Sequence, residues 1–336
     1  MRIIIFLILL TASIGYAQTN DPCKAGIVQP TPAQPQPKPT PALPQRTAKL
    51  LFKTKFGDGI SLGPVRNIVD FNAWQDIVGT DKKTGFSFPI KALQAYFTGF
   101  QWISYEKQTA ATIHSSIETA IRKVPGPEGT MVNELMHNVL QKGIGATPVG
   151  KGHAQVPFLI NRGHKSGDVK ELYIRYWYKI QKNISESLKE NVSSGNWKAI
   201  FEFKTGGYKD TYGGDYRITV GILKNKEGKI YWHTKGDNNA NGPFPEVSYW
   251  RVVNYDIPVP VDTWFKHEVY WNRSTGADGR FWTAINGKVI ADYKGPTMGD
   301  YKLPINRIFI NSYSGGAPPI ESHLTDLEIW STFPWR

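Results

Sequence analysis

The sequence predicts an all-β fold, a sandwich of two antiparallel sheets. Short segments with alternating side chains recur at regular spacing from residue 172 onward, and turn residues separate them. No long amphipathic helix pattern lies between these segments, so antiparallel pairing is favoured over parallel pairing. Hydrophobic residues make up 40% of the chain and aromatic residues 13%, which is enough to fill a core between two sheets.

The clearest part of this pattern is residues 262–293, which read as three short strands joined by tight turns. The segment Trp264–Trp271 alternates, and one of its faces carries Phe265, His267, Val269 and Trp271. Asn286-Gly287 is the residue pair typical of a type I′ hairpin turn, and Lys288–Tyr293 is the return strand. A hairpin so rich in aromatic residues needs a second sheet to pack against.

The same segment carries a family resemblance. Its pattern W-x-x-x-E-V-Y-W … G-x-x-x-x-x-I-N-G-K-V-I, followed by L-T-D-L-E-I-W-S-T-F-P at Leu324–Pro334, resembles concanavalin A-like jelly-roll polysaccharide lyases of bacteria. The nearest groups are the heparin lyase I-like lyases and the glucuronan or alginate lyases. The resemblance covers roughly Leu50 to Pro334 and implies a jelly roll with one concave sheet that forms a groove. Lectin-like domains share the hairpin, and fold alone does not give function.

The N-terminal part predicts export. Residues 1–17 read as a signal peptide, with Arg2 before the apolar run Ile3–Leu10 and a small-x-small cleavage site that ends at Ala17. The apolar run is too short to span a bilayer. Residues 18–46 form a Pro-rich linker, in which seven of the seventeen residues Gln29–Gln45 are proline. We therefore expect a secreted or periplasmic, monomeric protein without a membrane span, whose residues 47–336 form one jelly-roll domain.

The elements of this domain are predicted in chain order. Leu50–Phe56 is a strand, Trp74–Gly85 is turn-rich, and Ser115–Val124 and Thr130–Leu140 form a hairpin around Glu128-Gly129. The Ala, Met and Leu content of that hairpin also suits helices. The later strands are Leu172–Ile180, Lys198–Thr205, Tyr216–Leu223, Lys229–Thr234, Val247–Asn254, Phe265–Trp271, Arg280–Ile285, Ile305–Tyr313 and Leu324–Trp330.

Common catalytic and metal motifs are missing. The sequence has no nucleophile elbow, phosphate-binding loop, dinucleotide fingerprint or HExxH motif. Its seven histidines lack ligand spacing, and Cys23 is the only cysteine, so neither a zinc site nor an intramolecular disulfide is expected. We expect no required cofactor. A structural calcium ion stays open, because Asp326 and Glu328 lie two residues apart on the last strand.

Several predicted strands carry polar and aromatic side chains on alternate positions. Such faces suit a groove that binds sugars, since aromatic rings stack on sugar faces and cations bind carboxylates. The alternative is that these are simply the solvent-exposed faces of half-buried strands, without a binding role. A formal net charge of +12 favours an acidic partner, and in an exported chain without a basic cluster that partner is an acidic polysaccharide rather than nucleic acid.

The resemblance implies β-elimination on a uronic acid unit. This chemistry needs a group that neutralises the carboxylate, a base that removes the proton at C5 and an acid that protonates the leaving oxygen. We assign His233 as the base, since its unperturbed pKa lies near working pH, and Tyr313 or Tyr231 as the acid. The predicted substrate contacts are Arg251, Arg217, Lys204, Asn311, Tyr249, Arg175 and Trp177. The Q-I-H and Y-K-A-G-x-Y strings of the alginate lyase group are absent, so these assignments follow strand faces.

Two other functions remain open. A non-catalytic glycan-binding module would use Trp177, Tyr249 and Tyr313 as stacking platforms. A glycoside hydrolase would need two carboxylates about 5–10 Å apart across the groove, and Glu202 and Glu268 are the candidates. The acidic E-x-D-x-x-E cluster of jelly-roll glucanases is absent.

Overall fold

The computed structural model describes residues 47–69, 72–103, 114–140, 156–163, 166–189, 196–205, 216–238, 247–310 and 314–334. The chain divides into two units, Met1–Pro44 and Gln45–Arg336, and every described residue belongs to the second. The predicted signal peptide (1–17), the linker (18–46) and Cys23 therefore lie outside the described residues. Within the described ranges, no helix is long and apolar enough to cross a membrane.

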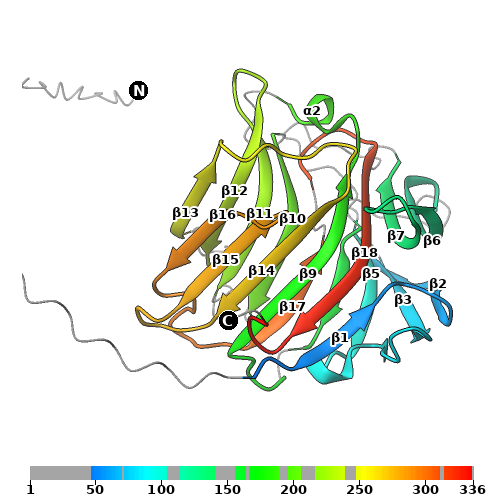
Figure 1. Cartoon of the computed structure of the whole chain (residues 1–336), viewed down its shortest axis with the longest axis horizontal. Helices are drawn as coiled ribbons and strands as arrows, with labels where there is room; N and C mark the ends of the chain where they lie inside the picture. Colours follow the sequence, from blue (N-terminus) through cyan, green and yellow to red (C-terminus); the bar gives the residue numbers. More distant parts are fainter. Residues whose placement is uncertain are drawn as a thin grey trace, which may run out of the picture. The chain divides into compact units, whose positions relative to one another are not determined.

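Two large antiparallel sheets form the domain, as predicted (Figure 1). Sheet A has the order β16 (Lys288–Lys294), β15 (Arg280–Ile285), β14 (Phe265–Asn272), β9 (Glu171–Ile180), β18 (Ile320–Trp330), β7 (Met131–Val139) and β6 (Ile117–Pro125), and β1 (Leu50–Thr54) also pairs with β18.

Sheet B is larger and contains strands from both halves of the domain. Its order is β13 (Ser248–Asn254), β12 (Ile230–Asp237), β11 (Arg217–Lys224), β10 (Trp197–Thr205), β17 (Ile305–Ile310), β8 (Phe158–Asn161), β5 (Phe97–Ile103), β3 (Asn72–Thr80) and β2 (Ile60–Val69), and β4 (Ser87–Phe88) pairs with β3. The short helical segments among the described residues are η1 (Lys91–Leu93), α2 (Ile184–Ser187) and residues 114–116, which precede β6 and include the first two residues of the predicted strand Ser115–Val124.

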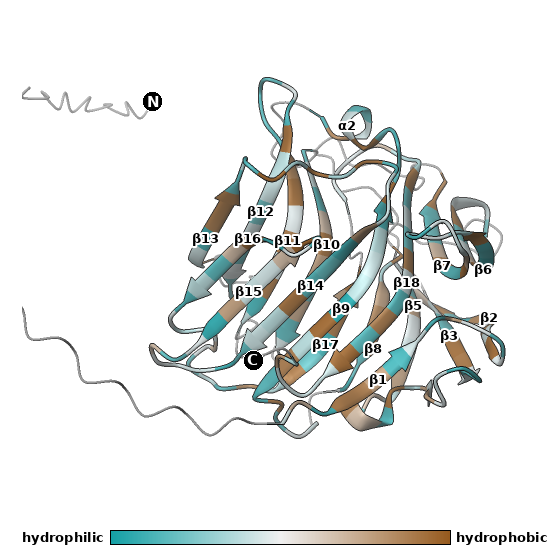
Figure 2. Ribbon diagram, in the orientation of Figure 1, coloured by the Kyte–Doolittle hydropathy of each residue, from teal (hydrophilic) through white to brown (hydrophobic). Residues whose placement is uncertain are grey.

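The core lies between the two sheets, where alternate side chains of facing strands meet. Phe203 of sheet B contacts Trp271 of sheet A with ring centroids 4.7 Å apart, and Trp232 contacts Phe265 at 5.9 Å. Figure 2 shows the resulting alternation of hydrophobic and hydrophilic residues along the strands. Each strand of the pleated sheets thus sends one set of side chains inward and the other set to an outer face.

The predicted hairpins are confirmed. β15 and β16 are joined through Asn286 and Gly287, whose φ angles of 50° and 76° are those that a type I′ turn requires. β6 and β7 pair from Ile117↔Val139 to Pro125↔Met131, so the strand interpretation of this region is right and the helix alternative is wrong. The predicted alternation of β14 also holds, since Phe265, His267, Val269 and Trp271 are all buried.

One region differs from the prediction. The stretch predicted as turn-rich contains most of β3, which pairs with β2 and β5 in sheet B. Its inward side chains include Ala73, Gln75 and Ile77, a small, a polar and one bulky apolar residue, so the period of two is hard to see in the sequence. Strands β2, β5 and β8 were not predicted.

Two histidines and a lysine are among the ionisable side chains buried inside the sandwich. His267 is bonded to the Tyr176 hydroxyl at 2.7 Å and to Thr283 at 2.9 Å, and burial lowers its pKa to about 3. Burial also lowers the pKa of His137 to about 3 and that of Lys198 to about 7. The Lys198 ammonium nitrogen is buried without a hydrogen-bond partner among the residues that the structure describes. These groups belong to the interior and are not accessible to a substrate.

Candidate functional site

Charged and aromatic side chains gather on the outer face of sheet B, which we call the polar face. It is defined by Glu202, Lys204, Arg217, Thr219, Tyr231, His233, Lys235, Asp237 and Arg251, on β10 to β13. Strand register explains their grouping, because Lys204, Arg217 and Asp237 occupy one cross-strand row. The next row contains Glu202, Thr219, Lys235 and Arg251. The side chains between these positions point into the core.

Ion pairs fix the position of several of these groups. The Arg217 guanidinium binds both carboxylate oxygens of Asp237, at 2.8 and 2.7 Å, and the Lys235 ammonium lies 2.8 Å from the same carboxylate. Glu202 lies 3.4 Å from Lys204 and 3.6 Å from Arg217. Cations therefore outnumber carboxylates on this part of the face, where Arg251 adds a further positive charge.

Opposing effects act on the pKa of the Asp237 carboxylate. Its burial would raise its pKa, but the hydrogen bond and charge of Arg217, together with Lys235, outweigh burial and lower the pKa. Asp237 thus stays ionised, and it holds the Arg217 and Lys235 side chains in place.

His233 lies among these cations. Burial, together with the positive charges of Arg251 and Lys235, lowers its pKa to about 4, although Asp237 acts in the opposite direction. The prediction that His233 has an unperturbed pKa is therefore wrong. The imidazole is nevertheless neutral at neutral pH, which is the form that a base requires. Within the part of the chain that the structure describes, the His233 ring makes no hydrogen bond. One ring nitrogen is thus able to accept a proton from a bound molecule.

Tyr231 lies two positions before His233 on the same face of β12. Its ring contacts Tyr255 at a centroid distance of 4.6 Å. Burial raises the pKa of Tyr231, and Tyr255 raises it further, although Arg251 opposes this. Tyr231 therefore keeps its proton at neutral pH and is able to donate it. Two residues along a strand correspond to about 7 Å, so the two side chains reach neighbouring atoms of one ligand.

The structure does not bring all of the predicted site residues together. Lys204, Arg217, Tyr231, His233 and Arg251 come together on the polar face. Tyr249 lies at the β-bulge between β12 and β13, where its 46% exposed ring stacks on Tyr216 with centroids 5.0 Å apart. Asn311 and Tyr313 lie outside the described residues, so their predicted roles remain predictions.

Arg175 and Trp177 lie elsewhere and correct the expectation of one shared groove. Both are on the outer face of β9, which is in sheet A between β14 and β18. Arg175 binds Glu328 at 2.7 Å, and Trp177 lies under the Lys266 ammonium at 5.4 Å. Alternation along a strand predicts which residues share a face, but it does not tell which sheet the strand joins.

The two carboxylates considered for hydrolysis are also separated. Glu202 is on the polar face of sheet B, whereas Glu268 is on the outer face of sheet A, where the Tyr173 hydroxyl donates a hydrogen bond to it at 2.5 Å. The core lies between these two faces. Glu202 and Glu268 therefore cannot flank one glycosidic bond.

An apolar patch beside the cations was missed. Phe97, Leu159 and Phe309 form a small cluster, and Trp74 packs against Phe97 with ring centroids 5.0 Å apart. The Lys204 ammonium lies 5.0 Å from the Phe309 ring centre. The patch belongs to strands that were not predicted, apart from β17. Asp237 was also missed, although it continues the alternation of Tyr231, His233 and Lys235.

A metal site does not emerge from the described ranges, in which no three His, Cys, Asp or Glu side chains cluster in a way that could hold an ion. Both oxygens of Glu328 accept bonds, from Lys53 at 2.8 Å and Arg175 at 2.7 Å. A bulge with a φ of 51° at Asp326 separates it from Glu328. The structural calcium ion stays a prediction.

Comparisons with known proteins give similar structures at low identity. No protein-family model matches the sequence, and no curated protein matches it. The alginate lyase Aly36B is 17% identical, with 70% of this chain and 93% of that chain covered and a TM-score of 0.41. An endo-β-1,4-glucuronan lyase from the fungus Trichoderma reesei is 10% identical, with coverages of 64% and 88% and a TM-score of 0.45. The binding domain of Botulinum neurotoxin DC is 13% identical, with coverages of 76% and 47% and a TM-score of 0.39.

Proposed function

We propose that this protein is a polysaccharide lyase that cleaves a uronic acid-containing polymer by β-elimination on the polar face. The observation that carries the proposal is the placement of a neutral histidine, His233, among cations and beside a protonated tyrosine, Tyr231. A structural sheet surface needs charges that neutralise one another. Among the described residues, the cations around His233 outnumber the carboxylates, and the His233 ring makes no hydrogen bond. This arrangement suits an anionic ligand from which the histidine removes a proton.

The reaction follows from these roles. Arg251 neutralises the uronate carboxylate, which makes the proton at C5 more acidic, and Lys204, three strands away in sheet B, contacts a neighbouring unit of the polymer. The neutral His233 ring removes that proton, and the electron pair forms the C4–C5 double bond while the C4–O bond breaks. Tyr231 donates its proton to the leaving oxygen. Tyr313 was the other predicted acid and lies outside the described residues.

Substrate binding also changes the pKa of the His233 base. A carboxylate placed between Arg251 and His233 offsets the positive charge that lowers the pKa of His233. The pKa of the imidazole therefore rises when the substrate is bound, which strengthens the base at the moment when it is needed. A neutral sugar would not produce this effect, so acidic polymers are favoured over neutral ones.

The test is to incubate the full chain with alginate, glucuronan, glycosaminoglycans and a neutral glucan, while following the ultraviolet absorbance of unsaturated uronic acid. We expect a rise with an acidic polymer, and its loss in His233→Ala. A rise that survives this substitution contradicts the assignment of the base. Retention of a polymer without a rise in absorbance would instead identify a glycan-binding module. New reducing ends without absorbance would identify a hydrolase.

Export is part of the same proposal, since large acidic polysaccharides are met outside the cytoplasm. Residues 1–17 would direct the chain to the secretory route and residues 18–46 would act as a spacer. Fractionation of the native host tests this, and we expect the mature chain, cleaved after Ala17, in the periplasm or medium.

A further inference from the structure

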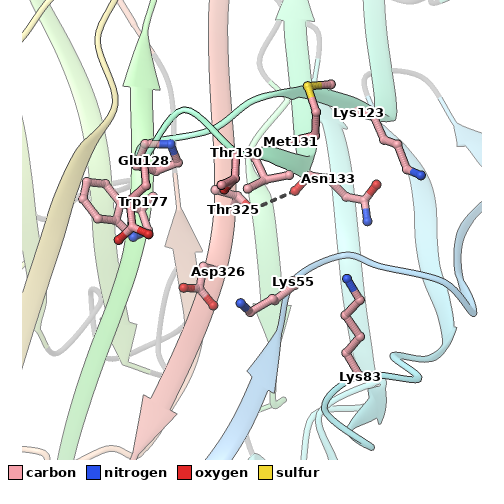
Figure 3. Close-up of a pocket in the computed structure, with 12 residues that line it drawn as sticks. Lys55, Lys83, Lys123, Glu128, Thr130, Met131, Asn133, Trp177, Thr325 and Asp326 are labelled. Atoms are coloured by element: carbon pink, nitrogen blue, oxygen red, sulfur yellow. Dashed lines mark hydrogen bonds between the residues drawn. The ribbon is translucent and has the colours of Figure 1, made fainter.

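A polar cavity lies on the outer face of sheet A, on the opposite side of the core from the polar face. It has a volume of about 290 Å³, close to the lower end of the range for small-ligand pockets. Side chains from β6, β7, β9 and β18 and from the segments after β1 and β3 line it (Figure 3). Its charged and aromatic lining residues are Lys55, Lys83, Lys123, Glu128, Asp326 and Trp177, so three cations face two carboxylates.

Trp177 forms an aromatic wall of this cavity. On the β14 side, its cross-strand neighbour is Lys266, whose ammonium lies 5.4 Å from the ring centre. On the β18 side its neighbour is Thr325, which also lines the cavity. Lys266 therefore supports the ring from the side away from the cavity. A half-buried, supported indole beside a hollow is a suitable stacking surface for a sugar ring.

Three lysines supply positive charge. Lys55, Lys83 and Lys123 come from three separate segments, and their ammonium groups take part in no ion pair or hydrogen bond among the residues that the structure describes. This differs from two neighbouring cations on sheet A, Lys53 and Arg122, which bind Glu328 and Glu134. Cations without partners around a hollow suit an anionic group such as a carboxylate.

Asp326 supplies an acceptor that the protein leaves unused. It sits in the bulge of β18 with a φ of 51°, and its Oδ1 atom is buried without a hydrogen-bond partner within the described ranges. Buried polar atoms are normally satisfied, so a ligand hydroxyl is a fitting donor. Bulges commonly redirect a side chain in this way. Inorganic phosphate would be repelled by this carboxylate and has no ring face to stack on the indole.

We propose that this cavity is an accessory binding site for an acidic sugar unit, separate from the polar face. Trp177 stacks on the sugar ring, the lysines bind its carboxylate, and Asp326 accepts a bond from a hydroxyl. The proposal rests on the proposed function for the class of ligand. Because the two sites lie on opposite sheets, the accessory site holds the polymer without taking part in its cleavage.

The experiment uses affinity electrophoresis in gels that contain alginate, glucuronan or a neutral glucan. The full chain carries His233→Ala so that cleavage cannot change the gel. The test variant adds Lys55→Ala and Lys83→Ala, both at exposed positions where folding is not at risk. The control variant adds Lys288→Ala and Lys294→Ala, two exposed lysines of β16, and so removes the same charge.

We expect the test pair to weaken retention by an acidic polymer about five- to twentyfold, and the control pair to leave it unchanged. The same test pair, in a chain with His233 intact, should cleave short soluble oligosaccharides at the normal rate. Equal retention of the test and control variants would overturn the accessory site. So would a lack of retention of every variant, and in that case the absorbance assay still decides separately whether the chain is a lyase.

Discussion

His233 on sheet B and His323 on sheet A occupy similar positions, each on the outer face of a strand, but their surroundings are opposite in charge. His323 lies 2.9 Å from Glu134 and 3.1 Å from Glu321, and these carboxylates raise its pKa although burial opposes them. His233 lies among Arg251 and Lys235, and burial together with these positive charges lowers its pKa to about 4.

The difference separates a structural surface from a functional one. On sheet A, Arg122 also binds Glu134 and Glu321, so the charges around His323 satisfy one another. Among the described residues of the polar face, four cations face two carboxylates, Glu202 and Asp237, so this part of the surface suits a bound anion. A histidine on the outer face of a strand thus has a role that depends on the sign of the charges around it.

The largest expected effect is on turnover. His233→Gln should lower kcat by about 10²- to 10⁴-fold, the usual contribution of general base catalysis, whereas His323→Gln should leave it unchanged. Initial rates on the best polymer of the panel measure both. Equal losses in the two variants would remove the distinction between the two faces.

The next effect is on stability. Glu134 is fully buried between Arg122 and His323, so Glu134→Gln removes the buried one of the two carboxylates that they share and leaves only Glu321. We expect the free energy of unfolding to fall by about 3 kcal/mol in urea titrations. Glu227→Gln, in an exposed turn, is the matched control and should change little. A similar value for both variants would show that the sheet A network does not stabilise the fold.

A smaller effect concerns pH. Because the folded pKa of His323 is raised above its usual value of 6.5, its stabilising contribution is complete below that value and is lost as the pH rises through the folded pKa. Urea midpoints of the wild type should therefore fall from neutral to alkaline pH. His323→Gln should show a flatter profile over the same interval, and an unchanged slope would contradict the assignment.

The smallest effect concerns the base itself. Removing one nearby positive charge by Arg251→Ala should raise the pKa of His233 above about 4, although burial, the largest cause of the lowered value, remains. Nuclear magnetic resonance titration of the imidazole measures this. Lys294→Ala on β16 is the control and should leave the pKa of His233 where it is.

Much of the fold was predictable because its strands repeat simple patterns. β9, β14 and β15 show a period of two with bulky residues on the core face, and Asn286-Gly287 fixes a turn by its backbone preferences. β3 was missed because its inward residues include a small one, Ala73, and a polar one, Gln75, so the alternation of bulky apolar residues is not visible in the sequence. The site was predictable in part, since Tyr231 and His233 share a face by alternation alone.

The sequence by itself determined which residues share a strand face, because side chains alternate along any extended chain. Only the tertiary structure decided which faces meet and what charge surrounds each group, because strand order depends on contacts between segments far apart in the chain. Trp177 was thereby placed on sheet A, away from His233. The same strand order brought Arg251 to His233 and Glu134 to His323, whereas Lys235 and Glu321 share a strand face with these histidines by alternation alone.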